Sequence, residues 1–474
     1  MTDVEHQRLE ARYVDTADLR LARQGVTLRY RVGEGADGWD LKVPLGPRDD
    51  GVRDELHVEA SPDAPPAELL RIVSAYLRGD DVRHVAALVT FRDLRRLLAA
   101  DGTLLAELVD DTVEVVDGDV VTARFREIEV EDKGGGAAVL AAIGKRLRAA
   151  GAVQGRFEPK LVRALGPLAT APADPPPPAK IKSKATVRDV ATAYVRAHVR
   201  QLLDADVAIR LGGPEGVHDA RVAARRLRST LRTFEAVLVP EAAGALADEL
   251  AWFAGAFGDA RDSQVMFDRL RADAAALPAA DREAATAAVD RWAAATGDGG
   301  GSSINDLDDH RYGRLLTQLA LLSVAPPFTG PADVPALKAL PDLLRPVVRT
   351  FRSRMALAVA AGSVDADVHR ARIAGKRLRY AAEAVAPVYA KNSRGYLGTV
   401  TNLQEQLGTH HDITVALAAL RARSQETDLP AAEAFALGVL HAHEAAALAD
   451  QEALLRKLWA KQQDQVRLPG LTGG

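Results

Sequence analysis

An arginine-rich segment occurs twice in the second half of this 474-residue chain. Residues 218–228 are HDARVAARRLR, and residues 369–379, 151 positions later, are HRARIAGKRLR. A second pair of segments, FGDARD at 257–262 and LGTHHD at 407–412, has nearly the same offset of 150 positions. Two landmarks at almost one spacing indicate a tandem duplication, so this part of the chain is expected to fold as two similar helical bundles.

The repeated segment carries its basic residues on one side of a helix, because side chains three and four apart share a face. In the first copy, the opposite side carries the packing residues Ala223, Ala224, Leu227, Thr230 and Leu231. No acidic residue lies between Arg221 and Arg232 to form i,i+4 pairs, so these like charges destabilise a bare helix. A solvated surface is the simpler explanation, but an anionic partner explains the uncompensated charge better, and arginine suits phosphate oxygens.

The two copies, together with Gly258-x-x-Arg261-Asp262 and Gly408-x-x-His411-Asp412, resemble the CHAD domain over about Ala185 to Trp459. The resemblance implies two four-helix bundles related by pseudo-two-fold symmetry, with basic helices facing a central groove or pore and inorganic polyphosphate as the ligand. The expected phosphate-binding residues are His218, Arg221, Arg225, Arg226, Arg228, Arg232, Arg261, His369, Arg372, Lys376, Arg377, Arg379 and His411.

A proline-rich stretch with four successive prolines, Pro175 to Pro178, separates this helical region from one of different texture. Before it, polar and apolar residues alternate at 27–32, 39–43, 55–59 and 125–131, as is typical of strands. Helical stretches at 65–77 and 137–150 interrupt them. The fold class expected is therefore an α+β domain with a largely antiparallel sheet, followed by an all-α domain.

The expected boundaries follow from these patterns. They are a sheet domain at 1–168, a linker at 169–184, a helical domain at 185–460 with halves at about 185–325 and 337–460, and a tail at 461–474.

The sheet domain has its own candidate site. Glu127, Glu129 and Glu131 lie on one face of a predicted strand, about 6–7 Å apart, and like charges in a row need a hard cation or basic side chains opposite them. A site holding Mg²⁺ or Mn²⁺ together with phosphates is one explanation, and a solvated face with cross-strand ion pairs is an equal one. The basic residues expected to bind a triphosphate are Arg29, Arg31, Lys42, Arg92 and Lys160.

Four stretches, YVDTADLRL at 13–21, GVTLRYR at 25–31, WDLK at 39–42 and FREIEVE at 125–131, resemble the CYTH family of triphosphate tunnel metalloenzymes. The resemblance covers about Glu5 to Leu168. It implies an antiparallel β-barrel in which basic side chains grip a triphosphate, acidic ones hold a divalent metal, and a metal-positioned water attacks the terminal phosphoryl group.

The family's first strand carries a Glu-x-Glu-x-Lys signature, which this chain begins too late to contain. Glu5 to Asp15 fits the family's second strand instead. We therefore expect a tunnel-like barrel open along one edge with an under-coordinated metal. Two hypotheses remain, a metal-dependent triphosphatase and a descendant that binds a triphosphate or nucleotide without turnover.

Composition narrows the remaining function classes. The absence of cysteine excludes thiolate nucleophiles and Cys-ligated metals. The net charge of −4, from 61 basic and 65 acidic residues, conceals the arginine clusters. Residues 1–13 lack the apolar core of a signal peptide, and the uncharged stretch 315–332 contains three prolines. We expect no membrane span and a cytoplasmic location, with polyphosphate granules as a potential place of action.

Two alternatives to a polyphosphate-binding enzyme remain. Basic helices also track nucleic-acid backbones. Aromatic residues make up 5% of the chain and do not interleave with the arginines, so nucleic acid is the less favoured partner. A non-catalytic scaffold at polyphosphate granules is the other alternative, and it shares the binding prediction.

Overall fold

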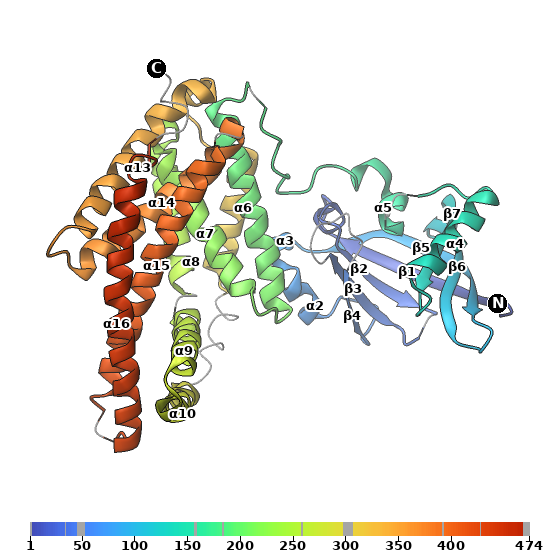
Figure 1. The fold of residues 1–474 in the computed structure, drawn as a ribbon. Helices are drawn as coiled ribbons and strands as arrows, with labels where there is room; N and C mark the ends of the chain where they lie inside the picture. The colour runs from blue at the N-terminus through green and yellow to red at the C-terminus, as the bar shows by residue number, and fades with distance from the viewer. Residues whose placement is uncertain are drawn as a thin grey trace. The chain divides into compact units, whose positions relative to one another are not determined.

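The computed structural model of the chain describes residues 2–33, 35–44, 53–155, 159–182, 184–256, 259–296, 307–390, 393–426 and 428–467, without the side chains of 53 and 259–263. The chain divides into two compact units, Met1–Asp174 and Pro175–Gly474, which are described one at a time (Figure 1). Within the described ranges, no helix combines the length and the apolar character needed to cross a membrane.

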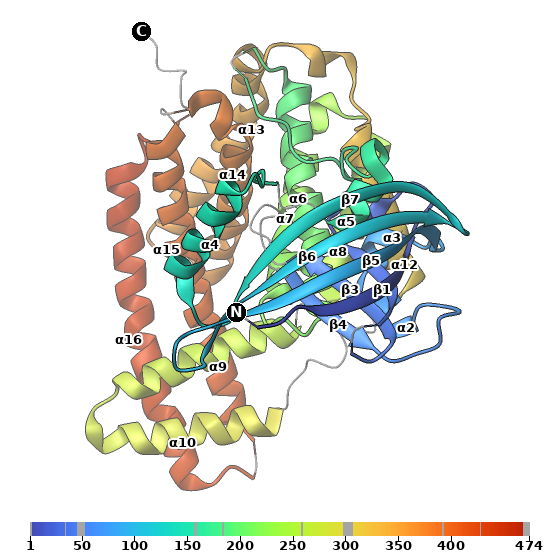
Figure 2. The same ribbon diagram turned by 90° about the vertical axis from the view of Figure 1, so that its right-hand side faces the viewer.

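The first unit contains a seven-stranded antiparallel sheet of order β4-β3-β2-β1-β5-β6-β7. The sheet is open, with β4 and β7 at its edges, which confirms the predicted antiparallel β-structure that is open along one edge. Figure 2 shows its long strands curving side by side. The strands are β1 (Glu5–Asp15), β2 (Thr27–Val32), β3 (Gly38–Pro44), β4 (Arg53–Val58), β5 (Arg83–Leu98), β6 (Leu104–Asp117) and β7 (Val120–Asp132).

Short helices complete this unit and cover part of one sheet face. Leu161 and Val162 of α5 pack with Leu19, which precedes α1, and with Ala22 of α1 in a buried cluster. That cluster also contains Ala11, Tyr13, Ala86, Leu88 and Val113 of the sheet. The helices are α1 (Arg20–Arg23), α2 (Ala67–Ile72), α3 (Ser74–Leu77), α4 (Gly136–Ala149) and α5 (Lys160–Leu165).

The second unit is helical, as predicted. Its first long helix begins with a capping box, in which the Thr186 hydroxyl accepts the Asp189 N–H and the Asp189 carboxylate accepts the Thr186 N–H. The helices are α6 (Val187–Arg210), α7 (Gly216–Thr233), α8 (Pro240–Ala256), α9 (Asp259–Ala276), α10 (Ala279–Thr296), α12 (His310–Val324), α13 (Ala336–Ala358), α14 (Asp365–Tyr389), α15 (Ser393–Arg423) and α16 (Ala431–Gln462).

The duplication is visible in the helix order. At the sequence offset of about 150 residues, α6 and α7 correspond to α13 and α14. The continuous helix α15 corresponds to α8 and α9, and the first half of α16 corresponds to α10. Helix α7 ends at Thr233, and further along the chain Leu238 forms a β-bridge with Phe328.

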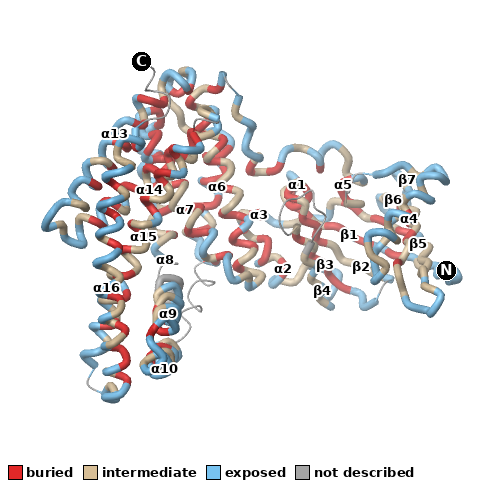
Figure 3. Tube along the Cα trace, viewed as in Figure 1, coloured by how far each residue is buried: buried red, intermediate tan, exposed pale blue. Residues whose placement is uncertain are grey.

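Helices of both repeats share a core. Phe267, Leu270 and Ala274 of α9 and Ala285, Ala288 and Val289 of α10 pack against Ala416 and Leu420 of α15 and Ala436, Leu437 and Leu440 of α16. Figures 1 and 2 both show α9 and α10 beside α16. Buried residues recur along one side of the helices in Figure 3, as the 3.6-residue period requires. The two repeats therefore fold as one unit.

Candidate functional site

The charged residues predicted in the sheet unit lie on one face of the sheet. Residues directly opposite each other in an antiparallel pair share a face. Arg29 pairs with Tyr13 and Asp40, and Arg92 pairs with Asp111, which pairs with Glu127. By the same register and the two-residue period, the face carries Arg29, Arg31, Lys42, Arg92, Glu127, Glu129 and Glu131, and Lys160 reaches it from α5.

Asp40 is the centre of the first polar cluster on this face. Its buried carboxylate lies 3.1 Å from Arg29 Nε, 3.0 Å from Arg31 Nε and 2.8 Å from His57 Nδ1. Burial opposes ionisation of Asp40, but the His57 hydrogen bond and the two guanidinium charges hold its pKa below the usual value. Arg29 also donates to the Tyr13 hydroxyl at 3.1 Å. The two arginines thus have an internal anion.

Lys160 is the centre of a second cluster. Its ammonium nitrogen lies 2.6 Å from Glu127, 3.1 Å from Asp111 and 3.6 Å from Glu129. Asp111 also accepts two hydrogen bonds from Arg92, at 2.9 and 3.0 Å, and its side chain is 1% exposed. Burial opposes the Lys160 charge, but the surrounding carboxylates raise the pKa of this lysine and keep it protonated.

The three predicted metal ligands are directed at cationic side chains. Glu127 pairs with Lys160 and Arg163, Glu129 with Lys160, and Glu131 with Lys133 at 2.9 Å. Carboxylate oxygens are the donors that Mg²⁺ prefers. However, the described residues contain no group of three or more His, Asp or Glu side chains arranged to hold a metal. As placed, Glu127 and Glu129 fit the ammonium of Lys160, and Glu131 fits that of Lys133, rather than a shared divalent cation.

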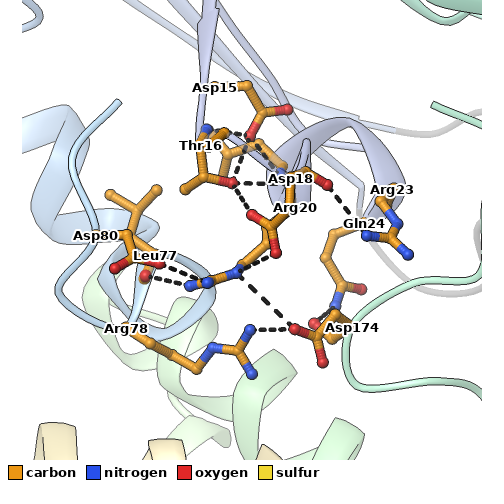
Figure 4. A network of polar contacts seen from close by, with 12 residues as sticks. Asp15, Thr16, Asp18, Arg20, Arg23, Gln24, Leu77, Arg78, Asp80 and Asp174 are labelled. Carbon is orange, nitrogen blue, oxygen red and sulfur yellow. Dashed lines mark hydrogen bonds and ion pairs between the residues drawn. The ribbon is translucent and has the colours of Figure 1, made fainter. Parts of the chain in front are cut away.

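The conspicuous motif at residues 13–21 has a structural role. The buried Asp15 carboxylate accepts backbone N–H groups from Thr16 at 2.7 Å, Leu21 at 2.9 Å and Ala22 at 2.8 Å, which closes the turn into α1 (Figure 4). Arg20 donates to the Leu77 carbonyl oxygen at 2.8 Å and pairs with Asp18 and Asp80. The motif therefore joins β1, α1 and the end of α3.

The basic residues of α7 lie on the side of the helix opposite its well-packed, buried side. Ala223, Ala224 and Leu227 are 0% exposed, as the sequence period predicted, and this packing fixes which way the arginines point. Arg221 is itself buried, at 9% exposure, whereas Arg232 is exposed. The half-buried members are Arg225, Arg226, Arg228, Arg372, Lys376, Arg377, Arg379 and His411, and the exposed ones are His218 and His369. The side chain of Arg261 lies outside the described residues.

Glu383 of α14 organises one contact between the two basic helices. Its carboxylate lies 3.1 Å from Arg226 Nε of α7 and 3.0 Å from Arg379 Nε, and it accepts a hydrogen bond from the Tyr194 hydroxyl at 3.2 Å. The Arg226 guanidinium also lies over the Tyr380 ring, 5.6 Å from its centre. Two predicted phosphate ligands are therefore already neutralised by the protein.

A second contact between the two basic helices contains three arginines and, among the described residues, no paired carboxylate, namely Arg228, Arg232 and Arg377. Arg377 Nη2 donates to the Arg232 carbonyl oxygen at 2.8 Å, so α7 and α14 bring these side chains together. Burial and the neighbouring Arg232 charge lower the pKa of both Arg228 and Arg377, with Asp248 and Glu235 acting weakly in the other direction. In the described part of the chain, none of the three forms an ion pair with a carboxylate. This is a cationic cluster without an internal anion.

Unsatisfied donors mark the same region. The buried Nε atoms of Arg225, Arg228 and Arg377 have no hydrogen-bond acceptor among the described residues, and Arg226 Nε has an ion pair with Glu383 at 3.1 Å but no well-directed hydrogen bond. A buried donor without a partner is unfavourable by about 1–3 kcal/mol, more when charged. An anion with several oxygens bound here would accept these hydrogen bonds and offset the repulsion.

The histidines and the residues missed by sequence reasoning complete the site. The rings of His369 and His411 lie 5.3 Å apart, from α14 and α15. Glu383 and Tyr194 were not predicted. Glu383 has a signal in the sequence, because it follows Arg379 by four residues and such pairs form on one helix face. Tyr194 has none, because α6 brings it to Glu383 only in the folded protein.

Comparisons with known proteins identify both units. A family model for the CYTH domain matches residues 1–161, and one for the CHAD domain matches residues 193–421. Two Mycobacterium tuberculosis proteins, "Uncharacterized protein MT2285" and "Uncharacterized protein Rv2226", are each 32% identical over 485 residues, which cover 95% of this chain and 90% of theirs.

Solved structures show partial similarity. The CHAD domain from the plant Ricinus communis is 29% identical, with 61% of this chain and 97% of that chain covered and a TM-score of 0.47. PptA from Streptomyces chartreusis is 23% identical, with 58% and 100% covered and a TM-score of 0.49.

Proposed function

The chain belongs to the proteins that join a CYTH domain to a CHAD domain, and from this premise we propose that it binds inorganic polyphosphate through α7 and α14. The observation that carries the proposal is the cluster of Arg228, Arg232 and Arg377, contributed by both helices and free of carboxylate partners in the described chain. Polyphosphate is the ligand that the CHAD resemblance implies.

The chemistry of the cluster supports a polyanion over a single small anion. Three guanidinium groups on two helices present donors over more than one phosphate group, and arginine binds phosphate oxygens in pairs. Nucleic acid is disfavoured because Tyr380, an aromatic side chain of α14 beside this region, already lies beneath Arg226 and is not free to stack on a base.

The test measures binding of long-chain inorganic polyphosphate by the full chain as a function of salt. Replacing Arg228, Arg232 and Arg377 by alanine should lower affinity by about a hundredfold or more, if each contact contributes about 1–2 kcal/mol. The matched control replaces Arg314, Arg349 and Arg394, which are exposed and form no ion pair in the described chain. Equal binding by the two triple variants would refute the proposal, and displacement by duplex DNA at equal phosphate concentration would remove its specificity.

For the CYTH domain we propose binding of a triphosphate, inorganic or nucleotide, on the charged sheet face. The supporting observation is that Lys160 and Arg163 of α5 lie over the face that also carries Arg92, so basic groups approach it from two sides. We expect calorimetric binding of tripolyphosphate that is lost in Lys160→Ala, and no binding by the native chain would discard this role. Orthophosphate release that requires Mg²⁺ or Mn²⁺ and is lost in Glu129→Ala would establish a metal-dependent triphosphatase instead of a binding domain.

A further inference from the structure

The two contacts between α7 and α14 are related by the duplication. The offset of 151 residues places Arg226 in correspondence with Arg377 and Arg228 with Arg379. It also places Arg232 in correspondence with Glu383, so an arginine in the first repeat stands where the second has a glutamate. Each contact is therefore a set of three equivalent positions that differs from the other at one of them.

The geometry of the two contacts follows this correspondence. At one, the Arg226 guanidinium of α7 meets the carboxylate of residue 383 on α14, at 3.1 Å. At the other, the Arg377 guanidinium of α14 meets residue 232 on α7, which is an arginine, so its donor turns to the backbone carbonyl oxygen at 2.8 Å. The same helix–helix approach thus gives one neutralised contact and one cationic contact.

The carboxylate of Glu383 has the surroundings that a bound phosphate would need. It accepts from Arg226, Arg379 and Tyr194, which are donors from three helices. At the equivalent contact, Asp248 acts on Arg228 and Glu235 acts on Arg377, and neither carboxylate forms an ion pair with them in the described chain. The donors that could bind a phosphate thus hold the Glu383 carboxylate at one contact and have no anion from the described residues at the other.

We propose that Glu383 is a built-in anion that fills one of two pseudo-equivalent phosphate positions, so that polyphosphate is anchored at Arg228, Arg232 and Arg377. This inference rests on the proposed function, and it adds where the polyphosphate chain is anchored and in which direction it extends. The bound chain begins at the cationic contact, and its extension toward Arg226 and Arg379 is limited by the carboxylate already there.

Two substitutions exchange the character of the contacts. Glu383→Gln removes the internal charge while keeping a hydrogen-bonding side chain, and we expect polyphosphate affinity to rise about three- to tenfold as Arg226 and Arg379 become available. The slope of log affinity against log salt should steepen by about one. Arg232→Glu builds the neutralised set at the other contact, and we expect affinity to fall at least about tenfold.

Controls separate binding from folding and from overall charge. Arg314→Glu makes the same charge change as Arg232→Glu at an exposed position with no ion pair in the described chain, and it should change affinity less than about twofold. In Arg232→Glu the new carboxylate gains guanidinium partners in Arg228 and Arg377, so the melting temperature should not fall. A well-folded Arg232→Glu protein with lost binding therefore reports on the site.

The outcomes distinguish this inference from the proposed function. If the native chain binds polyphosphate and both Glu383→Gln and Arg232→Glu bind equally well, the inference is overturned and the proposed function stands. If the native chain fails to bind but Glu383→Gln binds, the internal anion is supported and the proposed function of the native chain is lost. If neither binds, both are overturned.

Discussion

Replacing Asp15 by asparagine tests whether the most conspicuous motif of the sheet domain serves structure rather than chemistry. Asp15 is 0% exposed, and its two carboxylate oxygens accept three backbone N–H groups. Asparagine keeps one acceptor oxygen. If that oxygen retains Thr16 and Leu21, the new NH₂ group faces the Ala22 N–H, and two donors then meet without an acceptor.

The magnitude follows from these contacts. A buried N–H without an acceptor is unfavourable by about 1–3 kcal/mol, and two charge-assisted bonds become ordinary ones. Burial raises the pKa of Asp15, against the three N–H groups, so the neutral amide recovers part of the desolvation free energy of the carboxylate. We expect local stability around α1 to fall by about 2 kcal/mol.

Hydrogen exchange of the full chain, read by mass spectrometry on peptides spanning residues 15–23, measures this loss directly. A change of about 2 kcal/mol corresponds to roughly thirtyfold faster exchange of the Leu21 and Ala22 amides. The control Asp81→Asn makes the same change at an exposed side chain that forms no ion pair in the described chain, and it should change exchange little. Polyphosphate binding should stay unchanged in Asp15→Asn. Unaltered exchange at Leu21 and Ala22 would refute the reasoning.

Two further predictions concern charged groups in each unit. Burial lowers the pKa of His198 to about 4, below its value of about 6.5 in the unfolded chain. The contribution of neutral His198 to folding stability is therefore fully present above pH 6.5 and is lost as the pH falls through 4, by up to about 3 kcal/mol. Urea midpoints measured between pH 7 and pH 4 should show this decline, and His198→Gln should flatten it; a parallel curve would contradict the assignment. Lys160→Met leaves Asp111 and Glu127 with one fewer cation, and thermal unfolding should show a loss of stability of about 2–4 kcal/mol. Adding Glu127→Gln to Lys160→Met should restore part of this stability, because one unpaired charge is removed. No recovery in the double variant would show that the loss comes from packing.

The alternating segments predicted the shorter strands well. Thr27 to Val32 is a strand with the predicted limits, and Trp39 to Val43 lies within β3. The long strands β5 and β6 were not recognised. Their sequences place apolar runs such as Val85 to Val89 beside charged runs. Each face of a long curved strand has different surroundings along its length, so the strand does not keep a single period-two pattern.

The candidate residues were found in part for the same reason. Helical spacing identified Arg228 and Arg232 as one stripe, because neighbours on one helix are set by the sequence alone. The CHAD resemblance placed Arg226 and Arg379 in the same class as Arg228. The structure separates them, since Arg226 and Arg379 meet Glu383 and Arg228 does not.

The sequence alone determined the division into a sheet region and a duplicated helical region, and it identified which side chains carry charge on each face. Periodicity and internal repetition are local properties, so they survive without knowledge of the fold. Only the tertiary structure decided which charges neutralise each other. Glu383 meets Arg226 from a position 157 residues away, and Lys160 meets Asp111 across the sheet face. Because an ion pair depends on distances of a few ångströms, the availability of an arginine for phosphate follows from packing between helices, which spacing along the chain does not contain.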